Sequence, residues 1–163
     1  TGIAVSDDLK KMYNDMKTSK AHAWIVLKID GEEIVEVAKA EGEKKQTEER
    51  NTELFNNMKE VVAKLEDACY IAFDLRTVKN DGGVSRSLEK LFAIKFCSDD
   101  FPIRKKLKCA GTFDAVKSAF EGSKTLEVAD LSELTRDELI KAMYSVERST
   151  LGEQCNSMSH EKK

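Results

Sequence analysis

Residues 101–122 read FPIRKKLKCAGTFDAVKSAFEG, and this stretch does most to decide the fold because it predicts a long helix with two distinct faces. Pro102 suits the first turn of a helix, where its missing amide hydrogen is not needed. At about 100° per residue, one face is apolar in the way that packing against a core requires. The residues of this core face are Cys109, Phe113, Val116 and Phe120.

The same helix has a second apolar face, about a quarter-turn from the first. Its residues are Ile103, Leu107 and Ala110, with Arg104, Lys106 and Lys108 along the rim. A helix that buries one face and offers another apolar face with a basic rim is suited to enter a groove on a partner. The alternative interpretation is one broad core face with a solvated basic edge.

Charge is distributed unevenly along the chain. The net charge is −3 at neutral pH, which argues against a general nucleic-acid-binding protein. Residues 101–120 nevertheless carry five basic side chains and one acidic one, a net charge of +4, whereas residues 121–140 carry two basic and six acidic ones, a net charge of −4. A locally basic helix on an acidic protein favours a partner with one acidic surface. An anionic lipid headgroup would also satisfy this pattern.

Length and composition favour one globular domain. The chain of 163 residues is 40% hydrophobic and 35% charged, and it is long enough to bury about two-thirds of its unfolded surface. No apolar run approaches the roughly 20 residues that span a bilayer, and no signal segment begins the chain, so we expect no stable membrane insertion. The cysteines lack metal-binding or CxxC spacing and indicate buried thiols in a reducing compartment, the cytoplasm. They are Cys69, Cys97, Cys109 and Cys155.

Hydrophobic periodicity predicts four helices. The first follows an N-cap at Ser6, and the last follows capping-box spacing that begins at Thr135. The second carries a single apolar stripe from Leu54 to Leu65, and the third lies within residues 101–122.

Strands are predicted between these helices, the first two joined by a hairpin turn at Asp30-Gly31. The predicted strands are Trp24–Ile29, Glu32–Ala38, Cys69–Leu75, Leu91–Cys97 and Leu126–Val128. Residues 39–53 indicate a loop or helix lead-in, and Arg76–Ser87 has no periodicity, which predicts a mobile connection. The fold class is therefore α/β, with a mixed sheet of about five strands flanked by four or more helices.

Four stretches of the chain resemble the actin-depolymerising factor (ADF)/cofilin family, in the order and spacing of that family. Thr1–Asp7 is similar to its Ser-Gly-hydrophobic opening, and Tyr13–Lys17 resembles the end of its first helix. Cys69–Asp74 resembles its Cys-Arg-Tyr-Ala-hydrophobic-Tyr-Asp strand. Residues 102–117 resemble its long helix, with Pro-x-Arg-x-Lys-hydrophobic followed by small residues and Asp-Ala-Val-Lys.

This resemblance implies one ADF-homology domain over residues 1–149. Residues 150–163 are polar and have no apolar periodicity, which predicts a disordered tail. It implies a protein that binds actin monomers and filaments and promotes filament depolymerisation and severing without catalytic chemistry. The residues carried over to the monomer-binding surface are Thr1, Gly2, Ile3, Val5, Arg104, Lys106, Leu107, Gly111 and Thr112. Those carried over to the filament-binding surface are Arg86, Lys90, Lys141, Glu147 and Arg148.

The resemblance also implies a role for the main residues of the monomer-binding surface. The basic pair Arg104 and Lys106 would meet actin carboxylates, and Leu107 would fill an apolar part of the actin cleft. The small residues Gly111 and Thr112 would allow close approach.

Regulation is implied in the same way. Family members are often switched by phosphorylation of the Ser beside the N-terminal Gly, and here that position is Thr1. A phosphate would add about −1.5 to −2 charges and oppose docking on an acidic cleft. The basic helix would bind phosphoinositides in competition with actin. We expect a monomer whose partners are actin and anionic lipids, located in the cytoplasm on the cytoskeleton.

The chain departs from the family pattern at several positions. Lys95-Phe96-Cys97 stands where the family strand ends near a Trp, Cys109 replaces a Tyr, and residues 39–68 are longer than usual.

Two other kinds of binding protein are alternatives to an actin-depolymerising factor. One is a regulator of the actin branch complex similar to glia maturation factor, and the other is a phosphoinositide-binding module.

Catalytic groups are not evident in the sequence, so we expect no enzyme, cofactor or metal. His22 and His160 have no neighbouring residue that suggests a nucleophile pair, and Gly82-Gly83 lacks the Lys-Ser/Thr of a phosphate-binding loop. A thiol enzyme built on Cys109 or Cys97 is the remaining catalytic alternative.

Overall fold

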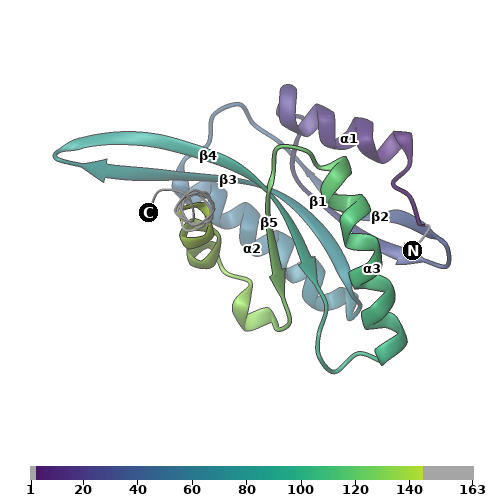
Figure 1. Cartoon of the computed structure of the whole chain (residues 1–163). Helices are drawn as coiled ribbons and strands as arrows, with labels where there is room; N and C mark the ends of the chain where they lie inside the picture. The colour runs from purple at the N-terminus through teal and green to yellow at the C-terminus, as the bar shows by residue number, and fades with distance from the viewer. Residues whose placement is uncertain (1–2, 145–163) are drawn as a thin grey trace, which may run out of the picture.

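The computed structural model describes residues 3–144, which form a five-stranded sheet with helices on both faces (Figure 1). The strand order is β2-β1-β3-β4-β5, and neighbours are antiparallel except for the parallel pair β4 and β5. The strands are β1 (His22–Asp30), β2 (Glu33–Glu41), β3 (Cys69–Asp81), β4 (Val84–Phe96) and β5 (Lys124–Val128). The helices are α1 (Asp7–Thr18), α2 (Glu48–Leu65), α3 (Ile103–Ala119), the short 3-10 helix η1 (Leu131–Glu133) and a last helix that begins at residue 136. The predicted fold class is confirmed. No helix among residues 3–144 is long and apolar enough to cross a membrane.

Two helical layers enclose the sheet. α1 and α3 cover one face, and α2 with the last helix covers the other (Figure 1). Side chains of β3 alternate between the layers, so Ile71 and Phe73 pack with α2 whereas Tyr70 and Ala72 pack with α1 and α3. The nearly continuous apolar run of Cys69–Leu75 is therefore buried on both faces, as predicted.

Side-chain caps begin three of the helices. The hydroxyls of Ser6, Thr47 and Thr135 each accept a hydrogen bond from the amide three residues further on, at 3.3, 3.0 and 3.1 Å. The caps predicted at Ser6 and Thr135 are confirmed. Pro102 lies at the N-cap of α3 rather than within its first turn.

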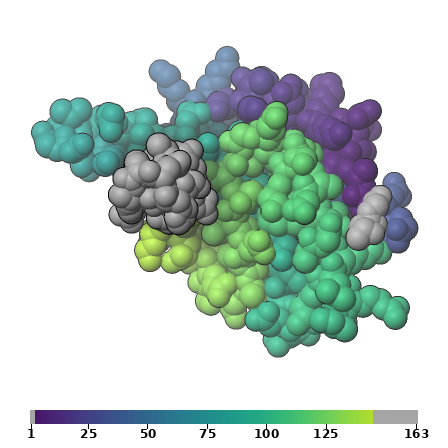
Figure 2. Space-filling model, viewed as in Figure 1, coloured from purple at the N-terminus to yellow at the C-terminus, as the bar shows by residue number. Residues whose placement is uncertain are grey.

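The segment predicted as a mobile connection, Arg76–Ser87, is instead a hairpin formed by extensions of β3 and β4. Its turn lies at Gly82 and Gly83, whose φ angles of +59° and +84° favour glycine. Residues 78–87, which we call the arm, are all exposed and project beyond the rest of the molecule (Figures 1 and 2). The prediction was wrong because the arm has no core to face, and its strands therefore lack the apolar alternation by which strands are recognised.

The loop between β2 and α2 is shorter than predicted. β2 reaches Glu41 and α2 begins at Glu48, so most of residues 39–53 belong to these two elements. At Gly42, a Cβ atom would lie 2.2 Å from the carbonyl oxygen of Lys20, so only glycine allows the chain to approach the α1–β1 connection this closely. Residues 43–47 then pass the point where the arm leaves the sheet, at Arg76 and Thr77, which we call the root of the arm. There Arg76 donates hydrogen bonds to the carbonyl oxygens of Glu43 and Lys44.

Candidate functional site

The outer face of α3 exposes two large apolar side chains. Ile103 is 67% exposed and Leu107 is 66% exposed, the largest fractions for large hydrophobic side chains among residues 3–144. Ala110 and Gly111 are also exposed on this helix. The core face is buried as predicted, with Cys109, Phe113, Val116 and Phe120 at 3% exposure or less. The predicted two-faced helix is confirmed, and the alternative of one broad core face is excluded.

Buried aromatic contacts fix α3 against the sheet and α1. The Tyr70 hydroxyl donates a hydrogen bond to the Cys109 carbonyl oxygen at 2.6 Å, and the Tyr70 ring stacks on Phe113 with centroids 5.9 Å apart. At the C-terminal end of the helix, Phe120 stacks on Tyr13 with centroids 4.6 Å apart. These contacts hold α3 at its middle and at its C-terminal end.

The thiols of the described chain are buried. Cys69, Cys97 and Cys109 have the predicted burial, and Cys155 lies outside the described residues. Burial raises the pKa of the Cys109 thiol to about 11 and also raises the pKa of Cys69. The raised pKa keeps the Cys109 thiol protonated at neutral pH, so its environment does not favour a thiol enzyme built on this residue.

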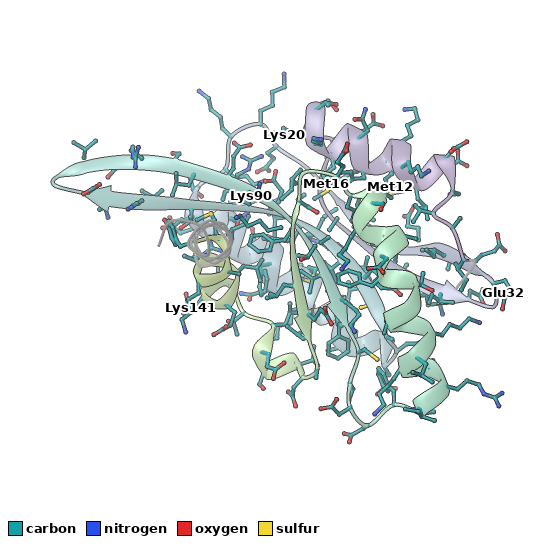
Figure 3. All side chains as sticks on the ribbon, viewed as in Figure 1. Met12, Met16, Lys20, Glu32, Lys90 and Lys141 are labelled. Carbon is teal, nitrogen blue, oxygen red and sulfur yellow. The ribbon has the colours of Figure 1, made fainter. Side chains whose placement is uncertain are left out.

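Basic side chains surround the first half of α3. Their contacts are Lys105 with Asp67 (2.5 Å), Lys106 with the Asp99 carbonyl oxygen (3.1 Å), and Lys108 with Glu32 (3.2 Å). Glu32 lies at the β1–β2 turn (Figure 3). Arg104 is exposed on the same turn of the helix. A cavity of about 370 Å³ lies between α3 and the β1–β2 turn, and its lining includes Arg104, Lys105, Lys108, Ile29 and Tyr70. The rim predicted around Leu107 is therefore present.

Three residues predicted for the monomer-binding surface are buried instead. Ile3 and Val5 are 5% and 6% exposed and pack in the core beneath α1 and α3. Thr112 is 1% exposed because it lies on the same side of the helix as the core residues three and four positions away. Their side chains are not available for direct contact, which corrects the prediction for all three. Thr1 and Gly2 lie outside the described residues. The predicted residues that the structure brings together on one face are Arg104, Lys106, Leu107 and Gly111.

Three of the residues predicted for the filament-binding surface, Arg86, Lys90 and Lys141, lie within the part of the chain that the structure describes. Arg86 is exposed on the arm, and Lys141 is exposed on the last helix (Figure 3). Lys90 is half-buried nearer the sheet, where its Nζ donates to the Gly122 carbonyl oxygen at 3.1 Å. The two predicted positions outside the described residues are Glu147 and Arg148.

Sequence reasoning missed the apolar residues of this second region. Val78 and Val84 on the arm are 40% and 61% exposed, and Tyr144 on the last helix is 42% exposed. The ammonium group of Lys79 lies 5.4 Å from the centroid of the Tyr144 ring, so the arm and the last helix are in contact. The hairpin signal Asp81-Gly82, with a valine on each side, was available in the sequence.

An exposed apolar helix face with a basic rim is suited to binding a protein partner. Comparison with known proteins identifies the kind of protein, because the family model of cofilin/tropomyosin-type actin-binding proteins matches residues 2–144. The chain belongs to the ADF/cofilin family of actin-binding proteins.

Individual relatives agree with this assignment. The chain is 25% identical to actin-depolymerizing factor 2, isoform c, of Caenorhabditis elegans, over 91% of this chain and 98% of the relative. It is 28% identical to actophorin of Entamoeba histolytica, over 90% of this chain and 99% of that protein.

A solved structure shows the same fold. Actin depolymerization factor 2 of Plasmodium berghei superposes with a TM-score of 0.69 at 21% identity, covering 86% of this chain and 95% of that structure.

Proposed function

We propose that this protein binds actin monomers through the outer face of α3 and actin filaments through the arm and the last helix, and thereby promotes filament depolymerisation and severing. The observation that carries the proposal is the exposure of Ile103 and Leu107 on a helix with a basic rim. The names of the relatives from Caenorhabditis elegans and Arabidopsis thaliana, which are actin-depolymerizing factors, support it.

Monomer binding follows from the chemistry of the α3 face. Burying a leucine or isoleucine side chain that is otherwise exposed contributes about 1.5–3 kcal/mol. Arg104 and Lys106 would pair with carboxylates on an acidic partner surface, which steers the encounter. Gly111 lacks a side chain and allows the partner backbone to approach the helix.

Filament disassembly needs no chemistry from this protein. A ligand that prefers one filament geometry shifts the filament toward that geometry by no more than its difference in affinity for the two states. We therefore propose a regulator that is not an enzyme and needs no cofactor. It would act as a monomer on the cytoskeleton, with the binding domain over residues 1–149.

Two modes of regulation belong to the same proposal. Phosphoinositides would compete with actin for the basic rim of α3. Phosphorylation of Thr1 would place negative charge near an acidic partner and weaken monomer binding.

The test compares the wild-type chain with Arg104→Ala/Lys106→Ala in filament pelleting and pyrene-actin assembly assays. The matched control is Lys59→Ala/Lys64→Ala, which removes two positive charges from α2 on the opposite face of the sheet. We expect the wild type and the control to bind actin and raise the unpolymerised fraction, and the α3 variant to do neither. If the wild type leaves actin untouched, the proposal is wrong, and the branch-complex and phosphoinositide alternatives take its place.

A further inference from the structure

The arm and the last helix meet at the backbone of Arg76, where the arm leaves the sheet. Arg136, on the first turn of the last helix, donates a hydrogen bond from Nη2 to the Arg76 carbonyl oxygen at 2.5 Å. Its Nε donates to Oδ1 of Asn51 on α2 at 3.1 Å. One guanidinium group therefore joins the last helix, α2 and the root of the arm.

The side chain of Arg76 fixes the same point from the other side of the strand. It is 6% exposed, and its Nε and Nη2 donate to Oδ2 of Asp74 at 3.1 and 2.8 Å. It also donates to the carbonyl oxygens of Glu43 and Lys44 in the loop before α2, at 2.8 and 3.1 Å. Residue 76 is thus held through both its side chain and its backbone.

Among residues 3–144, the arm has two further contacts beyond this point, the pairing of its own two strands and the cation–π contact of Lys79 with Tyr144. Thr77, which donates to Glu48 at 2.5 Å, is the last buried residue of β3, and residues 78–87 are exposed. On β4, Glu89 pairs with Lys20 at 2.6 Å, below the arm. A two-stranded ribbon without a core of its own is only marginally stable. The polar contacts at the root therefore set where the arm points.

We propose that Arg136 is a positioning residue, which holds the arm and the last helix in one fixed arrangement and so completes the filament-binding surface. This inference rests on the proposed function, because that surface is assigned to these two elements. Arg136 itself is largely buried, with its side chain 14% exposed, so it acts through the groups that it orients.

The position of Arg136 separates its effect from monomer binding. It lies on the face of the sheet covered by α2 and the last helix, whereas the outer face of α3 lies on the opposite side. Loss of the guanidinium would leave the Arg76 carbonyl oxygen and the Asn51 amide oxygen without this donor. The free-energy cost of these unpaired acceptors would weaken the structure at the root of the arm. The anchoring contacts of α3, from Tyr70 and Phe113, are untouched.

The test is Arg136→Gln, measured by hydrogen exchange of the arm amides, filament pelleting and monomer binding. We expect exchange within residues 78–87 to rise about tenfold and filament affinity to fall about tenfold, while monomer affinity stays within about twofold. The matched control is Arg50→Gln. It replaces another arginine, at the start of α2, and breaks only surface ion pairs with Glu43 and Glu53. Arg136→Lys keeps the charge and one donor, so we expect an intermediate effect. It also serves as the test if the Gln variant does not fold.

Three outcomes would overturn the inference. They are unchanged exchange of the arm, a looser arm with normal filament binding, or a parallel loss of monomer and filament binding that marks a general structural defect. Failure of the wild type to bind filaments would instead overturn the proposed filament function and, with it, the functional role of Arg136. Hydrogen exchange, which needs no actin, would still show whether Arg136 holds the arm.

Discussion

α3 and the arm both expose apolar side chains, yet opposite kinds of interaction hold them in place. Leu107 on α3 is 66% exposed, and Val84 on the arm is 61% exposed. The backbone beneath Leu107 is fixed by buried apolar side chains on the inner side of the helix. The direction of the arm depends instead on hydrogen bonds and ion pairs at its root. Apolar packing spreads the stabilisation of α3 over many weak contacts. The root of the arm depends on a few hydrogen-bond donors, so a single substitution should weaken it more.

The largest expected effect comes from placing a carboxylate in each surface in turn. Leu107→Asp should reduce monomer affinity by about 30-fold or more, because it removes a central apolar contact and sets a negative charge against an acidic partner. Val84→Asp should leave monomer affinity unchanged and weaken filament pelleting. Each variant serves as the control for the other, since both replace an exposed apolar residue. Fluorescence titration with labelled monomers and pelleting with filaments measure the two effects.

The comparison between the two surfaces breaks if the effects of these variants do not separate. Equal loss of monomer binding in both variants would mean that the arm belongs to the monomer-binding surface. Because both side chains are mainly exposed, the thermal unfolding temperatures should stay close to that of the wild type, and unfolding curves check this.

The α3 surface could be predicted from the sequence because a helix displays its two faces as a simple period. Cys109, Phe113 and Val116 recur at helical spacing, and Leu107 falls outside that set. The same helical spacing places Thr112 on the core side, because it lies three residues after Cys109 and four before Val116. The family resemblance assigned this position to the surface, and helical spacing alone would have corrected it. Ile3 was also assigned to the surface, and its burial could not be predicted because nothing near it in the sequence shows that it packs beneath two helices.

The arm and its root could not be predicted in the same way. Residues 78–87 are mostly polar, with Val78 and Val84 as their only large apolar residues, and a strand that faces no core has no apolar alternation. The contact between Arg136 and the Arg76 carbonyl joins positions 60 residues apart. No local pattern marks an arginine that will be buried, since most arginines are exposed.

A smaller effect should distinguish the two neighbouring small residues of α3. Gly111→Leu adds a side chain to the exposed face and should lower monomer affinity about tenfold by preventing close approach. Gly111→Ala should bind nearly as well and raise the free energy of unfolding by about 0.5–1 kcal/mol, because glycine weakens a helix interior. Thr112→Val should leave monomer affinity unchanged, since Thr112 is buried. Monomer titrations and chemical denaturation measure these outcomes. A loss of binding in Thr112→Val that matches Gly111→Leu would contradict the two-faced arrangement.

The smallest effect is a difference in response to acid, and it arises from two carboxylates at the root of the arm. The hydrogen bond from Thr77 holds the pKa of Glu48 below its ordinary 4.5, with further lowering by a bond to the Val78 backbone and by Arg136. The hydrogen bond from Lys20 lowers the pKa of Glu89 in the same way, and Arg76 adds to it. Such carboxylates bind protons more weakly in the folded chain than in the unfolded one. Their stabilisation is therefore complete above pH 4.5 and is lost as the pH falls through the folded pKa values.

Acid should consequently loosen the arm before it loosens α3, whose anchoring contacts are apolar rings and a tyrosine–carbonyl hydrogen bond. Nitrogen-15 relaxation of backbone amides, followed as the pH is lowered from about 6 to about 3, should show rising mobility in residues 78–87 while α3 stays rigid. Both carboxylates are substantially exposed, so the change should be modest. Thr77→Val removes the bond that depresses the Glu48 pKa, so the titration midpoint of Glu48 should move up toward 4.5 and the mobility of the arm should depend less on pH. If α3 and the arm loosen together in the wild type, these charges do not hold the root of the arm. The proposed difference between α3, held by apolar packing, and the arm, held by polar contacts, would then be wrong.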